Sequence, residues 1–294
     1  MKIVLDAKLG SVYDDAVASR YHLPTRYLRL VHDAIGDWAV FRRPRDGGEG
    51  IAYFGAGLIA SVTPDRHHAG HHYASIEDYL PFPSPVPWKP DGEYAERTLR
   101  EIKNVARVGV HLRGRSVRPL EEKDFVSIVE RGLRDVADPD NRRRYWPQDE
   151  EMPEGFFERS VETRLRSRLL RNASFRKLVC DAYDDRCAVT RLRIVNGGGR
   201  AEVQAAHIRP VKDGGPDLVQ NGLALSATAH WLFDRHLITI DPEHRLVVSH
   251  NKVPGELRSL LAPAEERIHL PSDPRMWPSD RFLAYHRECF GSGR

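Results

Sequence analysis

The sequence predicts a two-domain protein of the α+β class, and three observations lead to that prediction. The chain has 294 residues, more than one domain usually contains. Its first third holds short apolar runs separated by Gly and Pro, a pattern typical of strands and turns. Further along, apolar residues recur at helical spacing, and a short strand–turn–strand–helix pattern lies in the last third.

Composition restricts the class of protein only loosely. A hydrophobic content of 40% is enough for a buried core, and the net charge of +3 says little about nucleic acid. No apolar run approaches the roughly 20 residues that a membrane span needs, so no membrane partner is expected. Cys180, Cys187 and Cys289 form no CxxC pair, and no signal peptide is visible. We therefore expect a cytoplasmic protein with reduced thiols.

Residues 1–115 are predicted to form the first domain, which is mostly β. Its strands are expected at 1–5, 38–41 and 51–62, and a helix at 25–34 is expected between the first two strands. The four prolines between Pro81 and Pro87 are expected to interrupt regular structure after these strands.

The histidines between His67 and His72 present a choice between metal binding and an ordinary loop. A solvated loop is the expectation, because no partner acid is evident beside them. A helical connector is predicted for 116–175, with an amphipathic helix at 120–136.

A long basic helix is predicted over 156–183. Such a run is either a solvated helix face or a stripe that binds phosphates. In the second case the residues contacting the DNA backbone are Arg164, Arg168, Arg171, Arg176 and Lys177.

Residues 176–294 are predicted to form the last domain, and 202–241 carry its chemistry. A strand at 203–208 ends in His207, a glycine turn follows, and a second strand at 223–225 precedes a helix that carries His230. Such a unit can clamp one divalent ion between a hairpin and a helix. Neutral imidazole is a suitable base for activating water near neutral pH, and an amide such as Asn221 can fix the geometry beside it.

This segment resembles the HNH endonucleases of the ββα-metal class. The similarity runs through Ala206-His207-Ile208, Gly214-Gly215-Pro216-Asp217, Asn221-Gly222-Leu223-Ala224-Leu225, His230 and Phe233-Asp234. The resemblance implies that His207 is the general base, that Asn221 positions it and that His230 binds the metal. Asp234, one turn after His230, either joins the metal ligands or has a structural role. The implied cofactor is a divalent ion: Mg²⁺, Mn²⁺, Ni²⁺ or Co²⁺.

Two departures weaken the likeness. Many members of the family have an acidic second metal ligand where this chain has Ala206, and Gln204 on the same strand face is a weak substitute. His236 stands where this branch often has Gly. These departures leave open a second hypothesis, that of a DNA-binding protein whose catalysis is impaired.

The first domain resembles the PUA-like superfamily, most closely its EVE-type branch, with an SRA-type domain as the alternative. The similarity lies in the spans 21–27, 36–41 and 51–57. It implies a small curved β-barrel whose pocket accepts a flipped, modified cytosine. The candidates for this pocket are Tyr21, His22, Trp38, Phe54, Tyr79 and Asp37. The alternative role for each of them is core packing, and Asp37 can instead cap a turn.

Together these resemblances imply a modification-dependent endonuclease of the type IV-like restriction class, which cleaves double-stranded DNA. One HNH unit cuts one strand, so a double-strand break predicts a homodimer. An RNA-directed nuclease is the third hypothesis, because PUA-like domains also act on RNA.

Overall fold

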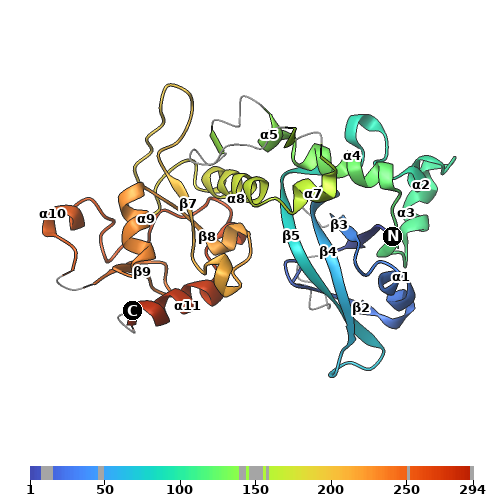
Figure 1. Cartoon of the computed structure of the whole chain (residues 1–294), viewed down its shortest axis with the longest axis horizontal. Coiled ribbons are helices and arrows are strands. Elements are labelled where there is room, and N and C mark those ends of the chain that lie inside the picture. Colours follow the sequence, from blue (N-terminus) through green and yellow to red (C-terminus); the bar gives the residue numbers. More distant parts are fainter. Residues whose placement is uncertain are drawn as a thin grey trace. The chain divides into compact units, whose positions relative to one another are not determined.

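The structure is a computed structural model that describes residues 1–7, 16–45, 50–138, 144–145, 155–156, 159–249 and 252–291 (Figure 1). The chain divides into two compact units. The first comprises Met1–Asp138 and Glu151–Arg171, and the second comprises Pro139–Glu150 and Asn172–Arg294. Each unit has buried apolar residues of its own.

A curled six-stranded sheet forms the centre of the first unit, and the predicted α+β class is confirmed. The strand order is β2-β5-β4-β3-β1-β6. Only β1 and β3 pair in parallel, and the other neighbours are antiparallel. The strands are β1 (Ile3–Asp6), β2 (Arg20–Pro24), β3 (Trp38–Arg43), β4 (Ala52–Pro64), β5 (His71–Pro87) and β6 (Val117–Pro119).

The expected interruption at the prolines is wrong, because β5 continues to Pro87. On one side its proline-rich end pairs with β4, with Pro81 opposite Gly55 and Pro87 opposite Ala52. On the other side β2 accompanies β5 only from His71 to Ser75. A strand that has a neighbour on one side alone tolerates proline, because the missing N–H groups would have pointed away from the ladder.

Short helices surround this sheet, and α4 (Glu122–Gly132) packs most closely against it. Phe125, Ile128 and Val129 form the buried stripe of α4, and Gly132 lies against the ring of Phe82 in β5. Much of the predicted connector therefore belongs to the first unit. The other helices here are α1 (Leu28–His32), α2 (Arg97–Arg100), α3 (Val108–Leu112), α5 (Arg134–Ala137) and α7 (Val161–Leu165).

The predicted long basic helix is instead two helices, α7 and α8 (Arg168–Ala182). Ser160 caps the start of α7, where its hydroxyl accepts from the N–H of Thr163 at 3.3 Å. The break falls at Arg166 and Ser167, and the carbonyl of Ser167 accepts the first hydrogen bond of α8 from Arg171. Serine favours this position before a helix, so the sequence contained a local stop signal that apolar periodicity alone did not reveal.

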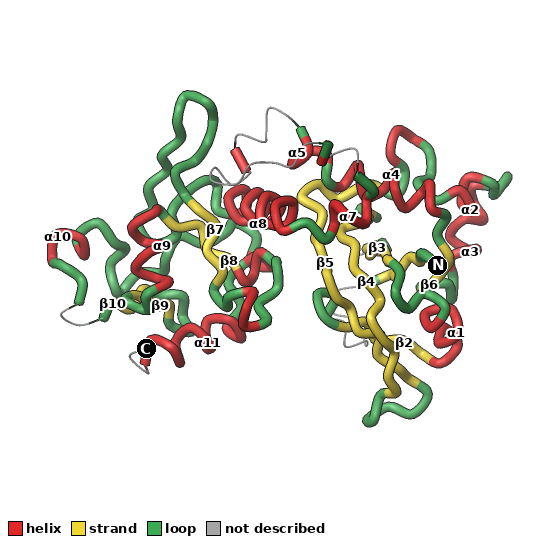
Figure 2. Tube along the Cα trace, in the orientation of Figure 1, coloured by secondary structure: helices red, strands yellow, loops and turns green. Residues whose placement is uncertain are grey.

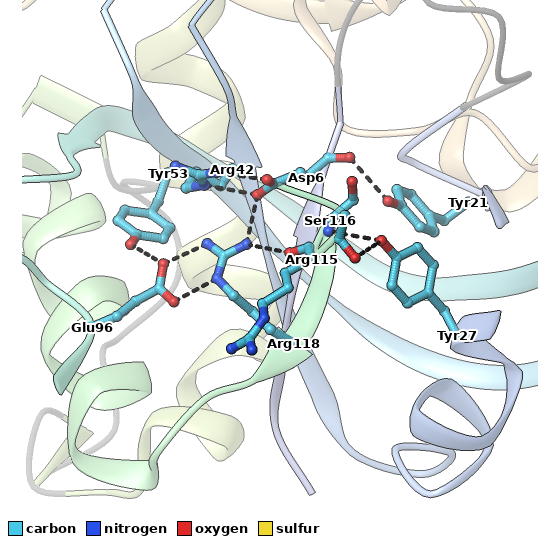
Figure 3. Close-up of polar contacts among 10 residues, drawn as sticks. Asp6, Tyr21, Tyr27, Arg42, Tyr53, Glu96, Arg115, Ser116 and Arg118 are labelled. Carbon is cyan, nitrogen blue, oxygen red and sulfur yellow. Dashed lines mark hydrogen bonds and ion pairs between the residues drawn. The ribbon is translucent and has the colours of Figure 1, made fainter. Parts of the chain in front are cut away.

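A network of charged side chains is buried within the curl of the sheet (Figure 3). Arg118 of β6 binds Glu96 at 2.5 Å and Asp6 of β1 at 3.0 Å, and Arg42 of β3 also binds Asp6 at 2.6 Å. Tyr53 donates its hydroxyl hydrogen to Glu96 at 2.6 Å. Burial lowers the pKa of Arg118, but the hydrogen bond and charge of Glu96 and the charge of Asp6 outweigh it and raise that pKa.

Two tyrosines join segments that are distant in the strand order. Tyr21 of β2 donates to the carbonyl of Asp6 of β1 at 2.9 Å, although three strands lie between β2 and β1 in the strand order. Tyr27 donates to the carbonyl of Gly114 at 2.6 Å and accepts from the N–H of Ser116 at 3.1 Å (Figure 3). These bonds hold the sheet in its curled form.

The second unit contains two small sheets and three helices after α8 (Figure 2). Its core includes Val179, Cys187, Leu223, Phe233 and Leu283, all at most 1% exposed. The elements are β7 (Gln204–His207), β8 (Gly222–Leu225), α9 (Ala227–Asp234), β9 (Ile238–Ile240), β10 (Leu246–Val248), α10 (Gly255–Arg258) and α11 (Asp280–Gly291).

Candidate active site

The β7–β8 hairpin and α9 form the strand–turn–strand–helix unit that the sequence predicts. β7 and β8 are antiparallel, with Gln204 opposite Leu225 and His207 opposite Gly222. Ser226 caps α9, because its hydroxyl accepts from the N–H of Ala229 at 3.4 Å. The helix therefore starts directly after β8 and carries His230 on its first turn.

His207 is held on two sides. Its Nε2 lies 2.9 Å from Oδ1 of Asp217, and the side chain of His207 keeps 20% of its surface exposed. Its ring also stacks on Phe175 of α8, with centroids 3.8 Å apart and planes 9° from parallel. A carboxylate that accepts from Nε2–H leaves Nδ1 as the nitrogen with a lone pair. The imidazole is thus fixed in position and in tautomer.

Asn221 is fully buried and acts on the loop that follows His207. Its Oδ1 accepts from the N–H of Arg209 at 2.9 Å, while its Nδ2 donates to the carbonyls of Arg209 at 3.0 Å and Pro216 at 2.9 Å. These bonds satisfy buried backbone groups of an irregular loop, which would otherwise be costly. Asn221 therefore ties down the loop whose start is His207 and whose end leads to Asp217.

His230 is oriented by Gln204, the first residue of β7. Oε1 of Gln204 lies 2.7 Å from Nδ1 of His230, and Oδ2 of Asp234 lies 3.4 Å from its Nε2. With Nδ1 donating to Gln204, Nε2 presents its lone pair on the side of Asp234. Burial lowers the pKa of His230, Asp234 opposes that shift, and the charge of His207 adds to it.

Ala206, which stands at the position of the acidic residue in many relatives, is fully buried in the core. The described residues that fit a divalent cation here are His230 and Asp234, an imidazole nitrogen and a carboxylate oxygen on one helix face. Gln204 orients His230 in the way that outer partners commonly orient metal-bound imidazoles.

A cavity of about 300 Å³ lies beside Gln204, and its lining is basic. Arg176 and Arg200 are among its lining residues, with Glu202 as the acid. The guanidinium of Arg176 donates to the carbonyls of Ala201 at 3.1 Å and Val203 at 2.7 Å. Arg176 thus supports the strand that carries His207 and borders the cavity.

The other residues predicted to contact DNA backbone have partners within the chain, apart from Arg168, which is exposed. Arg164 pairs with Glu130 at 2.9 Å, and Arg171 donates to the carbonyl of Tyr79 at 3.1 Å. Lys177 pairs with Asp181 one helical turn away. Contact with DNA remains a prediction for all five of the basic residues.

The structure places the candidates for the base pocket on or beside different strands of the sheet, and a pocket formed by them remains a prediction. His22 on β2 and Trp38 on β3 are separated by β5 and β4, and Trp38 is only 2% exposed. Asp37 binds Lys2 and the terminal amino group, each at 2.8 Å. Burial raises the pKa of Asp37, but the hydrogen bonds from Lys2, the amino terminus and the N–H of Trp38 lower it to about 2.

Phe54 and Tyr79 belong to one aromatic cluster. The ring of Phe41 lies 6.2 Å from that of Phe54 and 5.3 Å from that of Tyr79, with the latter pair edge to face. Tyr79 is buried over Gly55, where a Cβ would come within 2.6 Å of its hydroxyl oxygen. Tyr21 is buried and bonded to Asp6, as described above.

Comparison with known proteins agrees with the site. Residues 187–241 match the HNH endonuclease family, so the chain contains an HNH endonuclease domain that includes β7, β8 and α9. No curated protein matches the chain significantly. None of the helices in the described ranges is long and apolar enough to span a bilayer.

Two solved structures are similar at low levels. One is the modification-dependent TagI restriction endonuclease, with 15% identity and a TM-score of 0.32 over 97% of this chain and 81% of the other. The second is the type IV phosphorothioation-dependent restriction endonuclease ScoMcrA, with 14% identity and a TM-score of 0.22 over 98% of this chain and 50% of the other.

Proposed function

We propose that the protein is a metal-dependent endonuclease that cleaves double-stranded DNA carrying a modified cytosine. The second unit hydrolyses the phosphodiester backbone, and the first unit recognises the modification. The observation that supports the proposed nuclease activity is the orientation of two imidazoles. Asp217 holds Nε2 of His207 at 2.9 Å, and Gln204 holds Nδ1 of His230 at 2.7 Å.

In this proposal His207 takes the proton from the attacking water through Nδ1, because Asp217 occupies Nε2. Asp217 is a positioning residue, and its negative charge stabilises the imidazolium that forms. Phe175 keeps the ring from turning, and Asn221 holds the following loop. His230 and Asp234 would hold a divalent ion, which would supply positive charge for the phosphate oxygens.

The basic cavity beside Gln204 suits the DNA backbone. Arg176 and Arg200 offer guanidinium groups near the residue that orients His230, and phosphate contacts of this kind position a duplex without reading its sequence. Arg168, exposed on α8, is a further candidate for such contact.

The first unit is the proposed reader, of the PUA-like type. Its curled sheet supports this assignment, and the half-buried ring of Phe54 is the candidate for stacking on a flipped base. Each nuclease unit is proposed to cut one strand, so two copies in a homodimer would produce a double-strand break.

The test is digestion of a structured RNA and of matched DNA duplexes that differ only at cytosine, unmodified, 5-methylated or 5-hydroxymethylated, with Mg²⁺, Mn²⁺, Ni²⁺ or Co²⁺. His207→Ala is the control for contaminating nuclease. We expect metal-dependent cutting of a modified duplex by the wild type only. Equal cutting of unmodified duplex would refute the reader, cleavage of structured RNA alone would refute the DNA assignment, and no cutting with any ion would refute the nuclease.

A further inference from the structure

Three potential metal ligands meet at the end of the β4–β5 hairpin, in the first unit. The hairpin loop, residues 65–70, joins β4 to β5, and β2 runs beside this end of β5, with His22 opposite Tyr73 (Figure 1). Asp65 and His68 come from the loop, and His22 comes from β2. One donor atom from each of these three residues lies within 4.8 Å of the other two.

The geometry is centred on the carboxylate of Asp65. Its Oδ2 lies 3.1 Å from Nε2 of His22 and 2.8 Å from Nδ1 of His68. Its Oδ1 accepts from the N–H of His67 at 2.8 Å, which fixes the carboxylate in the turn. Donors bound to a tetrahedral ion at about 2.0–2.2 Å are separated by about 3.3–3.6 Å. The two oxygen–nitrogen distances therefore need to lengthen by less than about 1 Å to accept an ion, and all three donor atoms already lie within 4.8 Å of one another.

The surroundings favour neutral imidazole and an ionised carboxylate, the forms that bind metal. His22 is 6% exposed and stacks on Tyr73, with ring centroids 4.6 Å apart. Burial lowers the pKa of His22, in spite of the nearby charge of Asp65. The hydrogen bond from the N–H of His67 keeps the pKa of Asp65 well below its usual value.

The expectation that no partner acid lies beside these histidines is wrong at His68. His68 is exposed by 67%, yet its Nδ1 contacts an acid that lies three residues earlier. The sequence did not reveal the third donor, because His22 is distant in the chain and arrives through the pairing of β2 with β5.

We propose that His22, Asp65 and His68 bind a transition-metal ion of the Zn²⁺ class, separate from the ion of the nuclease unit. Two imidazoles and a carboxylate form a common donor set for zinc, with water in the remaining position. The ion links β2 to the loop of the β4–β5 hairpin and so stabilises this end of the sheet. All three residues of this site belong to the first unit, whereas His207 and His230 belong to the second.

Zinc binding to the full chain tests the proposal. We would measure bound Zn²⁺ per chain after equilibrium dialysis, in a His230→Ala background that removes the imidazole of the nuclease site. Substitution His68→Ala is expected to remove one equivalent, or to weaken its binding at least tenfold, since even outer partners of a metal contribute about 10–100-fold. His67→Ala, in the same loop, is the matched control and is expected to retain that equivalent.

Asp65→Asn provides a second variant that keeps the shape of the turn and the acceptor for the N–H of His67. It is also expected to lose the equivalent, and Co²⁺ bound to the parent is expected to show the visible absorption of a tetrahedral site. Binding that is unchanged by both His68→Ala and Asp65→Asn would overturn the proposal. So would a parent that binds no Zn²⁺, in which case Asp65 only accepts hydrogen bonds from the two imidazoles.

Discussion

At the scale of single residues, the candidate site depends on side chains that control the orientation of two histidines. Asp217 and Gln204 each contact one nitrogen of an imidazole and leave the other nitrogen for chemistry. Neither residue touches substrate in this account, so each is expected to act through the histidine that it holds.

Asp217→Asn is expected to reduce kcat for DNA cleavage by about tenfold or more. The loss should be smaller than that of His207→Ala, because general-base catalysis as a whole contributes about 10²–10⁴-fold. The KM for DNA should stay nearly constant, since Asp217 does not bind the duplex. Asp217→Glu should recover part of the rate. An unchanged kcat in Asp217→Asn would show that the contact with His207 is only structural.

Gln204→Ala is expected to raise the metal concentration that gives half-maximal cleavage by about 10- to 100-fold, because His230 loses the acceptor that fixes its ring. Cleavage rates across a series of Mn²⁺ concentrations would measure this change. Gln204→Glu keeps an acceptor at the same place and should retain tight binding. A Gln204→Ala enzyme with the metal requirement of the wild type would contradict the role given to Gln204.

At the scale of elements, the loop between β7 and β8 determines where His207 stands. A Cβ at Gly215 would lie 1.8 Å from the carbonyl oxygen of Arg209, a backbone atom that Asn221 holds in place. Gly214, by contrast, has a φ of +80° but only a side-chain atom of Arg209 within 4 Å. Gly215 therefore allows a close approach to the backbone of Arg209, whereas Gly214 allows a left-handed backbone conformation.

Gly215→Ala is expected to lower the free energy of unfolding of the second unit by at least about 2 kcal/mol, because the backbone must shift to admit the methyl group. Gly214→Ala should cost only about 1–2 kcal/mol, the usual strain of a left-handed alanine. Urea denaturation of the two variants would measure both values. A larger loss in Gly214→Ala than in Gly215→Ala would refute this view of the loop.

The sequence predicted β7, β8 and α9 well, because turn residues, a serine cap and strand alternation are all local signals. It failed at Pro81–Pro87, where a distant contact decides, because these residues extend β5 by pairing with β4 alone. It also missed the division of the basic helix at Ser167, because the apolar spacing continues across this local signal. Asp217 was within the recognised motif, but its pairing with His207 and the stacking of Phe175 needed the folded chain.

At the scale of the whole molecule, both units bury titratable groups, but the first unit pairs them as ions and the second buries one in its neutral form. The first unit neutralises Asp6 and Glu96 with Arg42 and Arg118, and such buried pairs are costly to break. The second unit buries His286 as a neutral ring that stacks on Phe233 at 3.7 Å and contacts Thr239 at 2.8 Å. The stability of the second unit should therefore be sensitive to acid.

Burial lowers the pKa of His286 from 6.5 to about 4. Between these values the unfolded chain binds a proton that the folded chain does not, so the contribution of His286 is complete above pH 6.5 and is lost as the pH falls towards 4. The loss amounts to at most about 3.5 kcal/mol, at roughly 1.4 kcal/mol for each pKa unit. Urea unfolding from pH 7 to 4 should show a shallower decline in His286→Gln than in the wild type. Parallel curves would contradict this assignment.

In the proposed mechanism His207 and His230 face one divalent ion, and Gln204 and Asp217 hold the two rings. Anomalous diffraction from crystals grown with Mn²⁺ would locate that ion directly. We expect a peak within bonding distance of Nε2 of His230, on the side of Asp234, with His207 facing the same space. A peak elsewhere with none at His230, or a His207 ring turned away from the ion, would contradict it.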